Sequence, residues 1–92
     1  MLQLFKISGD SLYPNYKNGQ RVLCRKVFRG TKIKVDDTVV FEKDAYGMMI
    51  KQIRSIDDNN YFVEGTDPMS IDSRNFGLLE RKEIKYKVLF KF

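Results

Sequence analysis

An early serine stands where the chain could present a nucleophile. Ser11 comes two residues after Gly9 and three before Pro14. Glycine permits positive φ angles and proline fixes the direction in which the chain leaves, so the stretch 7–14 predicts a strand that ends in a tight turn exposing the Ser11 hydroxyl. A plain turn made by Gly9 and Asp10 explains the same residues without any chemistry. Both interpretations stay open at this point.

A serine nucleophile needs a base, and the chain contains no histidine. This excludes a Ser-His-Asp triad and leaves lysine as the candidate base. Lys51 stands out because, in a strand predicted over 48–56, it shares one face with Met49 and Ile53. The alternative is that this face is exposed, or that the amine reaches solvent at the edge of a sheet.

The chemistry of this pair depends on the charge of the lysine. A lysine amine in water titrates near about 10.4, so at neutral pH it is protonated and cannot accept a proton from serine. Burial among apolar neighbours lowers the pKa of a lysine towards neutrality. An uncharged Lys51 could then take the proton of Ser11 during attack on a peptide carbonyl, and later return it to the leaving amine.

The elements that must position these two residues are strands. Ninety-two residues, 42% of them hydrophobic, are enough for one small core and too few for a second domain, so the chain 1–92 is expected to form a single domain. No helical period competes with the strand patterns apart from one turn around 78–83, which predicts an all-β fold of mostly antiparallel strands. The predicted strands span residues 1–7, 21–27, 38–42, 48–56, 61–64 and 84–92. In the last of them, alternation places five apolar residues on one face: Ile84, Tyr86, Val88, Phe90 and Phe92.

Composition narrows the class of protein further. The net charge of +5 arises from 17 basic and 12 acidic residues, but the basic residues are scattered along strands with no helix-turn-helix pattern and no zinc-ligand spacing, so a nucleic-acid partner is not predicted. The single cysteine, Cys24, cannot form an internal disulfide and is expected in the core. No apolar run is long enough to span a membrane and no secretory signal precedes the first strand, which predicts a soluble chain.

Several separated blocks of the sequence resemble type I signal peptidases. The block Gly-Asp-Ser-Leu-Tyr-Pro at 9–14 resembles the nucleophile box of that family, and the blocks at 37–41 and 50–53 resemble two of its strands, the second of which carries the catalytic lysine. Gly-Thr-Asp at 65–67 and Ser-Ile-Asp-Ser-Arg-Asn-Phe-Gly at 70–77 are similar to its polar box. The polar box is the most specific of these, because the related LexA-type self-cleaving repressors share the Ser/Lys dyad but lack the box. The resemblance runs from about Gly9 to Phe90.

The resemblance implies a role for each matching residue. Ser11 would be the nucleophile and Lys51 the general base, with Ser70 orienting the lysine and Asp72 with Arg74 bracing the site. It implies a signal-peptidase/LexA-like catalytic core and no cofactor or metal.

The oxyanion site implied by the resemblance differs from that of some relatives. The backbone N–H of Ser11 would stabilise the oxyanion. Gly9 occupies the position at which some members carry a serine whose hydroxyl is a second donor. Another backbone group or a water molecule would have to be the second hydrogen-bond donor to the oxyanion.

The expected function is that of a serine endopeptidase that cleaves a leader or signal peptide from a precursor protein, after a small residue. A non-catalytic peptide-binding domain of the same fold and a LexA-type self-cleaving regulator domain are the alternatives. The expected partner is a precursor protein or peptide, with no nucleic acid, and membrane association only through a segment missing from this chain or through peripheral contact. The chain is expected in the cytoplasm if it is complete, and at a membrane if an anchor segment belongs before it.

Overall fold

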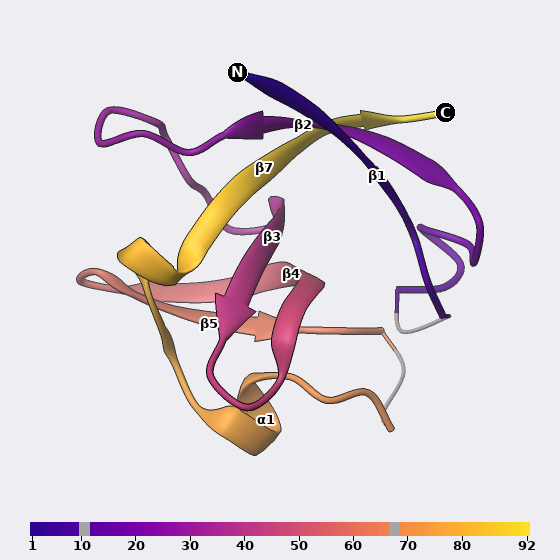
Figure 1. The fold of residues 1–92 in the computed structure, drawn as a ribbon. Helices are drawn as coiled ribbons and strands as arrows, with labels where there is room; N and C mark the ends of the chain where they lie inside the picture. The colour runs from indigo at the N-terminus through magenta and orange to yellow at the C-terminus, as the bar shows by residue number, and fades with distance from the viewer. Residues whose placement is uncertain (10–11, 67–68) are drawn as a thin grey trace.

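The protein is built from one antiparallel sheet whose seven strands follow the order β1-β2-β7-β3-β4-β5-β6 (Figure 1). The computed structural model describes residues 1–9, 12–66 and 69–92. Its strands are β1 (Leu2–Lys6), β2 (Arg21–Lys26), β3 (Thr38–Lys43), β4 (Gly47–Asp57), β5 (Asn60–Glu64), β6 (Leu79–Glu80) and β7 (Ile84–Lys91), with a short helix α1 (Ser73–Phe76) and a 3₁₀ turn η1 (Arg81–Glu83).

The predicted all-β fold is confirmed, and each of the six predicted strands has a counterpart in the sheet. The sequence patterns did not predict α1 or β6, and the turn expected around 78–83 is divided between β6 and η1. None of the helices in the described part of the chain is long and apolar enough to cross a membrane.

The centre of the sheet is β3, which is buried on both faces. Val39 and Phe41 point to one side and pack with residues of β4 and β5, while Val40 points to the other side and packs with residues of β1 and β2. We call the first cluster the β4–β5 core; it comprises Val39, Phe41, Ile53, Tyr61, Val63, Leu79 and Ile84. We call the second the β1–β2 core; it comprises Ile7, Val22, Cys24 and Val40. The two halves of the sheet thus bury opposite faces, with β3 shared between them.

Cys24 lies in the β1–β2 core as predicted. Its burial raises the pKa of the thiol to about 11, because the thiolate would lose its hydration there. The thiol therefore remains protonated at neutral pH and acts as a small apolar side chain.

The prediction that the apolar residues of β7 share one face is wrong, because the pairing of this strand changes register twice. Tyr86 pairs with Val40 but Ile84 pairs with Phe41, so one residue of β7 is unpaired between them. A second shift places Val88 opposite Cys24 and Phe90 opposite Leu23, which leaves Leu89 extra. Each additional residue reverses the alternation.

The physical result is that the apolar residues of β7 divide between the two faces. Tyr86 and Val88 pack against the β1–β2 core, whereas Phe90 and Phe92 project from the opposite face and are exposed.

Candidate active site

Lys51 is a buried lysine on β4. It lies opposite Val39 of β3, and the next residue on its own face, Ile53, is part of the β4–β5 core. The Lys51 residue is 4% exposed. The alternative of an exposed face is therefore excluded, and the inward orientation indicated by the alternation is confirmed.

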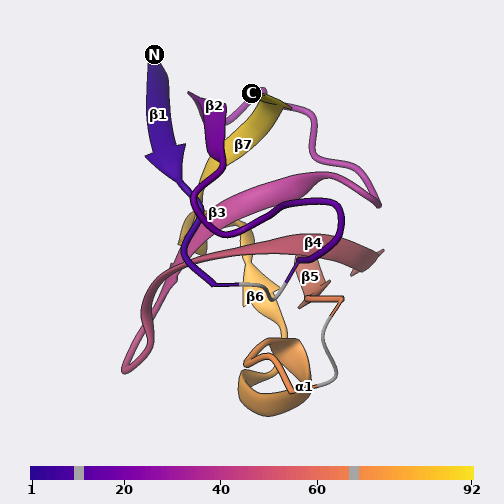
Figure 2. The ribbon, with the colours of Figure 1, turned by 90° about the vertical axis from the view of Figure 1, so that its right-hand side faces the viewer.

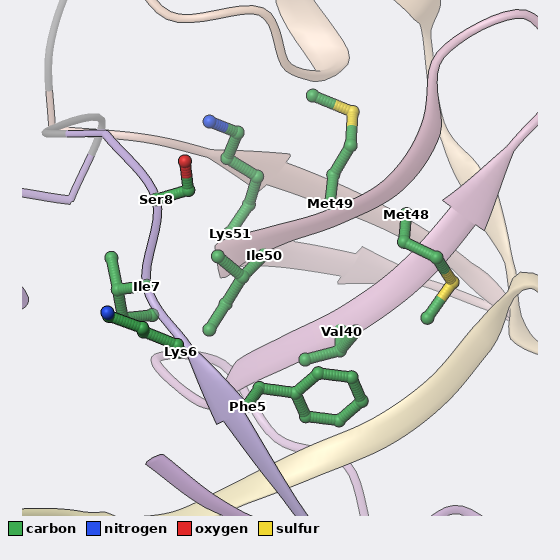
Figure 3. Close-up of a pocket in the computed structure, with 9 residues that line it drawn as sticks. All are labelled: Phe5, Lys6, Ile7, Ser8, Val40, Met48, Met49, Ile50 and Lys51. Atoms are coloured by element: carbon green, nitrogen blue, oxygen red, sulfur yellow. The ribbon is translucent and has the colours of Figure 1, made fainter. Parts of the chain in front are cut away.

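The Lys51 side chain borders a groove of about 350 Å³ between β1 and β4. Figure 3 shows the lysine amine on the same side of the groove as the Ser8 hydroxyl, and the side chains of Phe5, Val40 and Met48 towards the other side. The groove therefore has one end with hydroxyl and amine groups and one apolar end. Its walls are formed by Phe5, Lys6, Ile7, Ser8, Val40, Met48, Met49, Ile50 and Lys51.

Ser11, the predicted nucleophile, lies outside the described residues, as do Asp10, Asp67 and Pro68. The described residues on either side of Ser11 are fixed in the fold, because Ile7 is 5% and Leu12 2% exposed. The segment that leads to Ser11 also forms a wall of the Lys51 groove, through Ser8.

Gly9 has the positive φ that the turn prediction requires, at +89°. Its backbone N–H donates to Oδ1 of Asn18 at 2.9 Å, and the carbonyl of Ile7 accepts from the N–H of Gly19 at 2.8 Å. Asn18 and Gly19 thus hold the end of this segment in place. Because the Gly9 amide is bonded to Asn18, it is directed away from any role as an oxyanion donor.

The predicted polar box centres on the buried carboxylate of Asp72. Arg74 binds it in a bidentate manner, with Nε donating to Oδ1 at 2.9 Å and Nη2 to Oδ2 at 2.7 Å. The hydroxyl of Ser70 and the N–H of Gly65 each donate to Oδ2 at 2.9 Å. Asp72 also caps α1, because its Oδ1 accepts from the N–H of Arg74 at 3.0 Å. The three predicted residues Ser70, Asp72 and Arg74 therefore form one network.

These contacts set the charge state of Asp72. Burial by itself would raise the pKa of the carboxyl, but the hydrogen bonds from Arg74, Gly65 and Ser70 outweigh it and hold the pKa well below its usual range. Asp72 is thus an anion with its charge satisfied inside the network.

The network is attached to β5, the strand next to β4. The β4–β5 ladder ends where Gln52 of β4 pairs with Glu64 of β5, and the next residues along the two chains are Lys51 and Gly65. Gly65 donates to Asp72 there, and Nε of Arg74 lies 3.6 Å from a carboxylate oxygen of Glu64. The polar box is therefore held against the end of the ladder that carries Lys51.

The hydroxyl of Ser70 makes two hydrogen bonds within the polar box. It donates to Asp72 and accepts from Nη2 of Arg74 at 3.2 Å. Its predicted action in orienting Lys51 stays a prediction.

Of the residues that line the groove, the sequence analysis singled out only Lys51 as a site residue; Ser8, Phe5 and Met48 are among those it missed. The alternation in 1–7 places Phe5 and Ile7 on one face, but it does not reveal which face lines a groove. Met48 belongs to a hairpin arm whose two faces are both largely apolar in sequence, so the sequence does not show which of the two faces lines a groove.

In the described part of the chain, residues that commonly bind metals do not gather in a group of three or more. Comparisons of the sequence with protein-family models and with curated proteins find no match.

Proposed function

We propose that the protein is a serine endopeptidase of the signal-peptidase type, in which Ser11 is the nucleophile and Lys51 the general base. The observation that carries the proposal is a buried lysine at one end of an apolar groove, where the segment leading to Ser11 forms a wall. Burial favours the neutral amine, because a charged ammonium loses its hydration in an apolar environment. A neutral amine is the form that can accept a proton from serine.

The reaction would proceed in two steps. In the first, the Lys51 amine takes the proton of Ser11 as the serine oxygen bonds to the carbonyl carbon of the scissile peptide. The resulting ammonium returns this proton to the leaving amine as the C–N bond breaks, which leaves an acyl-enzyme ester. In the second, the amine takes a proton from water as the water oxygen bonds to the acyl carbon. The ester bond between the acyl carbon and the serine oxygen then breaks, and the ammonium returns the proton to the serine oxygen.

The oxyanion formed in each step needs backbone donors. The N–H of Ser11 is the proposed donor, and the Gly9 amide does not serve because it is bonded to Asn18. A donor of this kind commonly contributes on the order of a hundredfold or more to the rate.

The polar box would support this chemistry without adding charge to it. A free carboxylate near Lys51 would stabilise the ammonium and so oppose its action as a base. Asp72 avoids this effect because Arg74 neutralises it in a bidentate pair. The box therefore braces the end of the β4–β5 ladder, and the charge of Asp72 is balanced within the box itself.

The proposed substrate is a precursor protein whose leader or signal peptide lies extended in the groove. The apolar end, with Phe5, Val40 and Met48, would accept an apolar side chain of that peptide. A small residue at the cleavage position is proposed on the sequence resemblance alone. The chain would meet this substrate in the cytoplasm, or at a membrane if an anchor segment belongs to it.

Replacing Ser11 with alanine is expected to abolish cleavage, whereas Ser8→Ala is expected to retain it. Ser8 lines the groove, but only the proposed nucleophile, Ser11, is indispensable to the reaction. The measurement is product detection by mass spectrometry after digestion of a peptide library derived from a whole proteome. Cleavage that persists in Ser11→Ala and disappears in Ser8→Ala would assign the nucleophile to Ser8. A wild-type protein that binds such peptides and never cleaves them would be a peptide-binding domain.

Peptides with alanine or glycine before the scissile bond are expected to be cleaved tenfold or more faster than peptides with phenylalanine there. One extra methylene group changes the discrimination between substrates by about 10- to 200-fold, and an aromatic ring is a larger change. The measurement is kcat/KM for a panel of peptides that differ only at the residue before the scissile bond. Equal rates for small and bulky residues would contradict the proposed preference, although not the dyad.

A further inference from the structure

The face of β1, β2 and β7 that is turned away from the β1–β2 core is apolar and exposed; we call it the outer face. Its middle row consists of Leu4, Leu23 and Phe90, which lie directly opposite one another in the three strands. Leu4 is 53% and Phe90 56% exposed, although both are large apolar residues. Leu2 and Phe92 extend the same surface, with 56% and 57% exposed. Continuous exposed apolar surface of this kind marks a site of interaction.

Basic residues lie on both sides of the apolar row. Lys6 pairs with Arg21 on one side, and Arg25 pairs with Lys87 on the other. The three strands contain no acidic residue at all. They carry seven basic residues, namely Lys6, Arg21, Arg25, Lys26, Lys85, Lys87 and Lys91.

The side with Arg25 continues into a pocket of about 400 Å³, which Arg25, Lys32 and Leu89 help to line. Its other basic residue, Lys87, is paired with Asp37 at 3.3 Å. Arg25 and Lys32 are both exposed, so the pocket offers two cations to an incoming anion at the border of the apolar surface.

We propose that the outer face binds the surface of an anionic lipid bilayer. The row Leu4–Leu23–Phe90 would enter the boundary between headgroups and acyl chains, and the flanking cations, with the Arg25 pocket, would bind the phosphate groups. An apolar surface flanked by cations on both sides, on three strands that carry no carboxylate, matches such a bilayer in polarity and in charge.

A second copy of the chain fits this surface less well. In a two-fold symmetric contact the same surface meets itself, so the basic rows of the two copies would face each other without any acidic residue from these strands between them. Like charges placed together oppose association.

The strand β1 relates this surface to the groove. Leu4 points to the outer face, and the next residue, Phe5, lines the Lys51 groove on the opposite face. Figure 2 shows β1, β2 and β7 together at one end of the molecule, with α1 at the other end. Binding through the outer face would therefore hold the groove close to the bilayer, whether or not the protein is a peptidase.

Flotation with lipid vesicles tests the proposal. We expect the protein to float with vesicles of equimolar phosphatidylcholine and phosphatidylglycerol and to remain behind with phosphatidylcholine alone. Leu4→Ser should lower binding about tenfold, since an inserted apolar side chain is lost. Leu78→Ser, at a residue 47% exposed outside the outer face, should leave binding unchanged. Absence of flotation with the anionic vesicles, or an equal effect of the two variants, would overturn the proposal.

A matched pair of variants tests the contribution of the flanking cations to lipid binding. Arg25→Gln should weaken binding to the anionic vesicles about fivefold, and Arg54→Gln, which removes the same charge from β4, should not. Equal losses in both would mean that net charge alone attracts the protein, which would overturn a specific outer face.

A fluorescent variant reports insertion directly, because the chain has no tryptophan. Phe90→Trp should show a blue shift of its emission with anionic vesicles, and Leu78→Trp should not. Sedimentation of the wild-type protein and of Leu4→Ser completes the test. A dimer that Leu4→Ser dissociates would assign the outer face to a second copy and overturn the lipid proposal.

Discussion

Replacing Lys51 with methionine is expected to lower kcat/KM by about 10²–10⁴-fold while the protein stays folded. Methionine fills a similar volume but cannot accept a proton. Because Lys51 is buried, the variant should also unfold at the same or a higher temperature than the wild type, since an apolar side chain costs less to bury than an amine. Cleavage rates and thermal unfolding of the same preparations provide the measurement.

The control for this variant is Lys43→Met. Lys43 lies on the neighbouring strand β3, is half-buried, and pairs with Glu83 at 3.1 Å. Removing its amine should leave the cleavage rate unchanged and reduce stability by about 1 kcal/mol, the typical value of an incompletely buried ion pair. Full activity in Lys51→Met would refute the proposed base.

Replacing Asp72 with asparagine is expected to reduce the free energy of unfolding by about 3 kcal/mol at neutral pH. The variant leaves the guanidinium of Arg74 without its anion and weakens the hydrogen bonds from Gly65 and Ser70 to the same oxygen. In a domain of this size such a loss corresponds to a decrease in Tm on the order of 15 °C. Urea unfolding followed by circular dichroism measures it.

The difference between this variant and the wild type should depend on pH. The pKa of Asp72 is held well below its usual range in the folded protein, so its contribution to stability is complete above the pKa of an unfolded aspartic acid, about 3.9. It is lost as the pH falls from there towards the lower folded pKa. The free energies of unfolding of the wild type and of Asp72→Asn should therefore differ most at neutral pH and become more similar in strongly acidic solution.

Asp44→Asn is the matched control for the Asp72 variant, because Asp44 is an exposed carboxylate in the turn between β3 and β4. It should leave the free energy of unfolding within about 0.5 kcal/mol of the wild type at every pH. If Asp72→Asn behaved in the same way, the network would contribute no stability and could not act as a brace.

The sequence by itself determined the strands and the orientation of Lys51. Alternation is a local property with a period of two residues, and it predicted six strands of the sheet as well as the shared face of Lys51 and Ile53. The positive φ of Gly9 could likewise be expected, because glycine is the residue that adopts it without strain. The helix α1 was missed because four residues are too few to show a helical period.

Only the tertiary structure decided which apolar residues are buried together. The two register shifts in β7 depend on how that strand pairs with β2 and β3, and they turn Phe90 and Phe92 outward although the pattern along the strand is uninterrupted. The gathering of Ser70, Asp72 and Arg74 around the N–H of Gly65 likewise depends on where the chain returns against β5. Periodicity describes one strand at a time, whereas the burial of a side chain is decided by the neighbours that other strands bring to it.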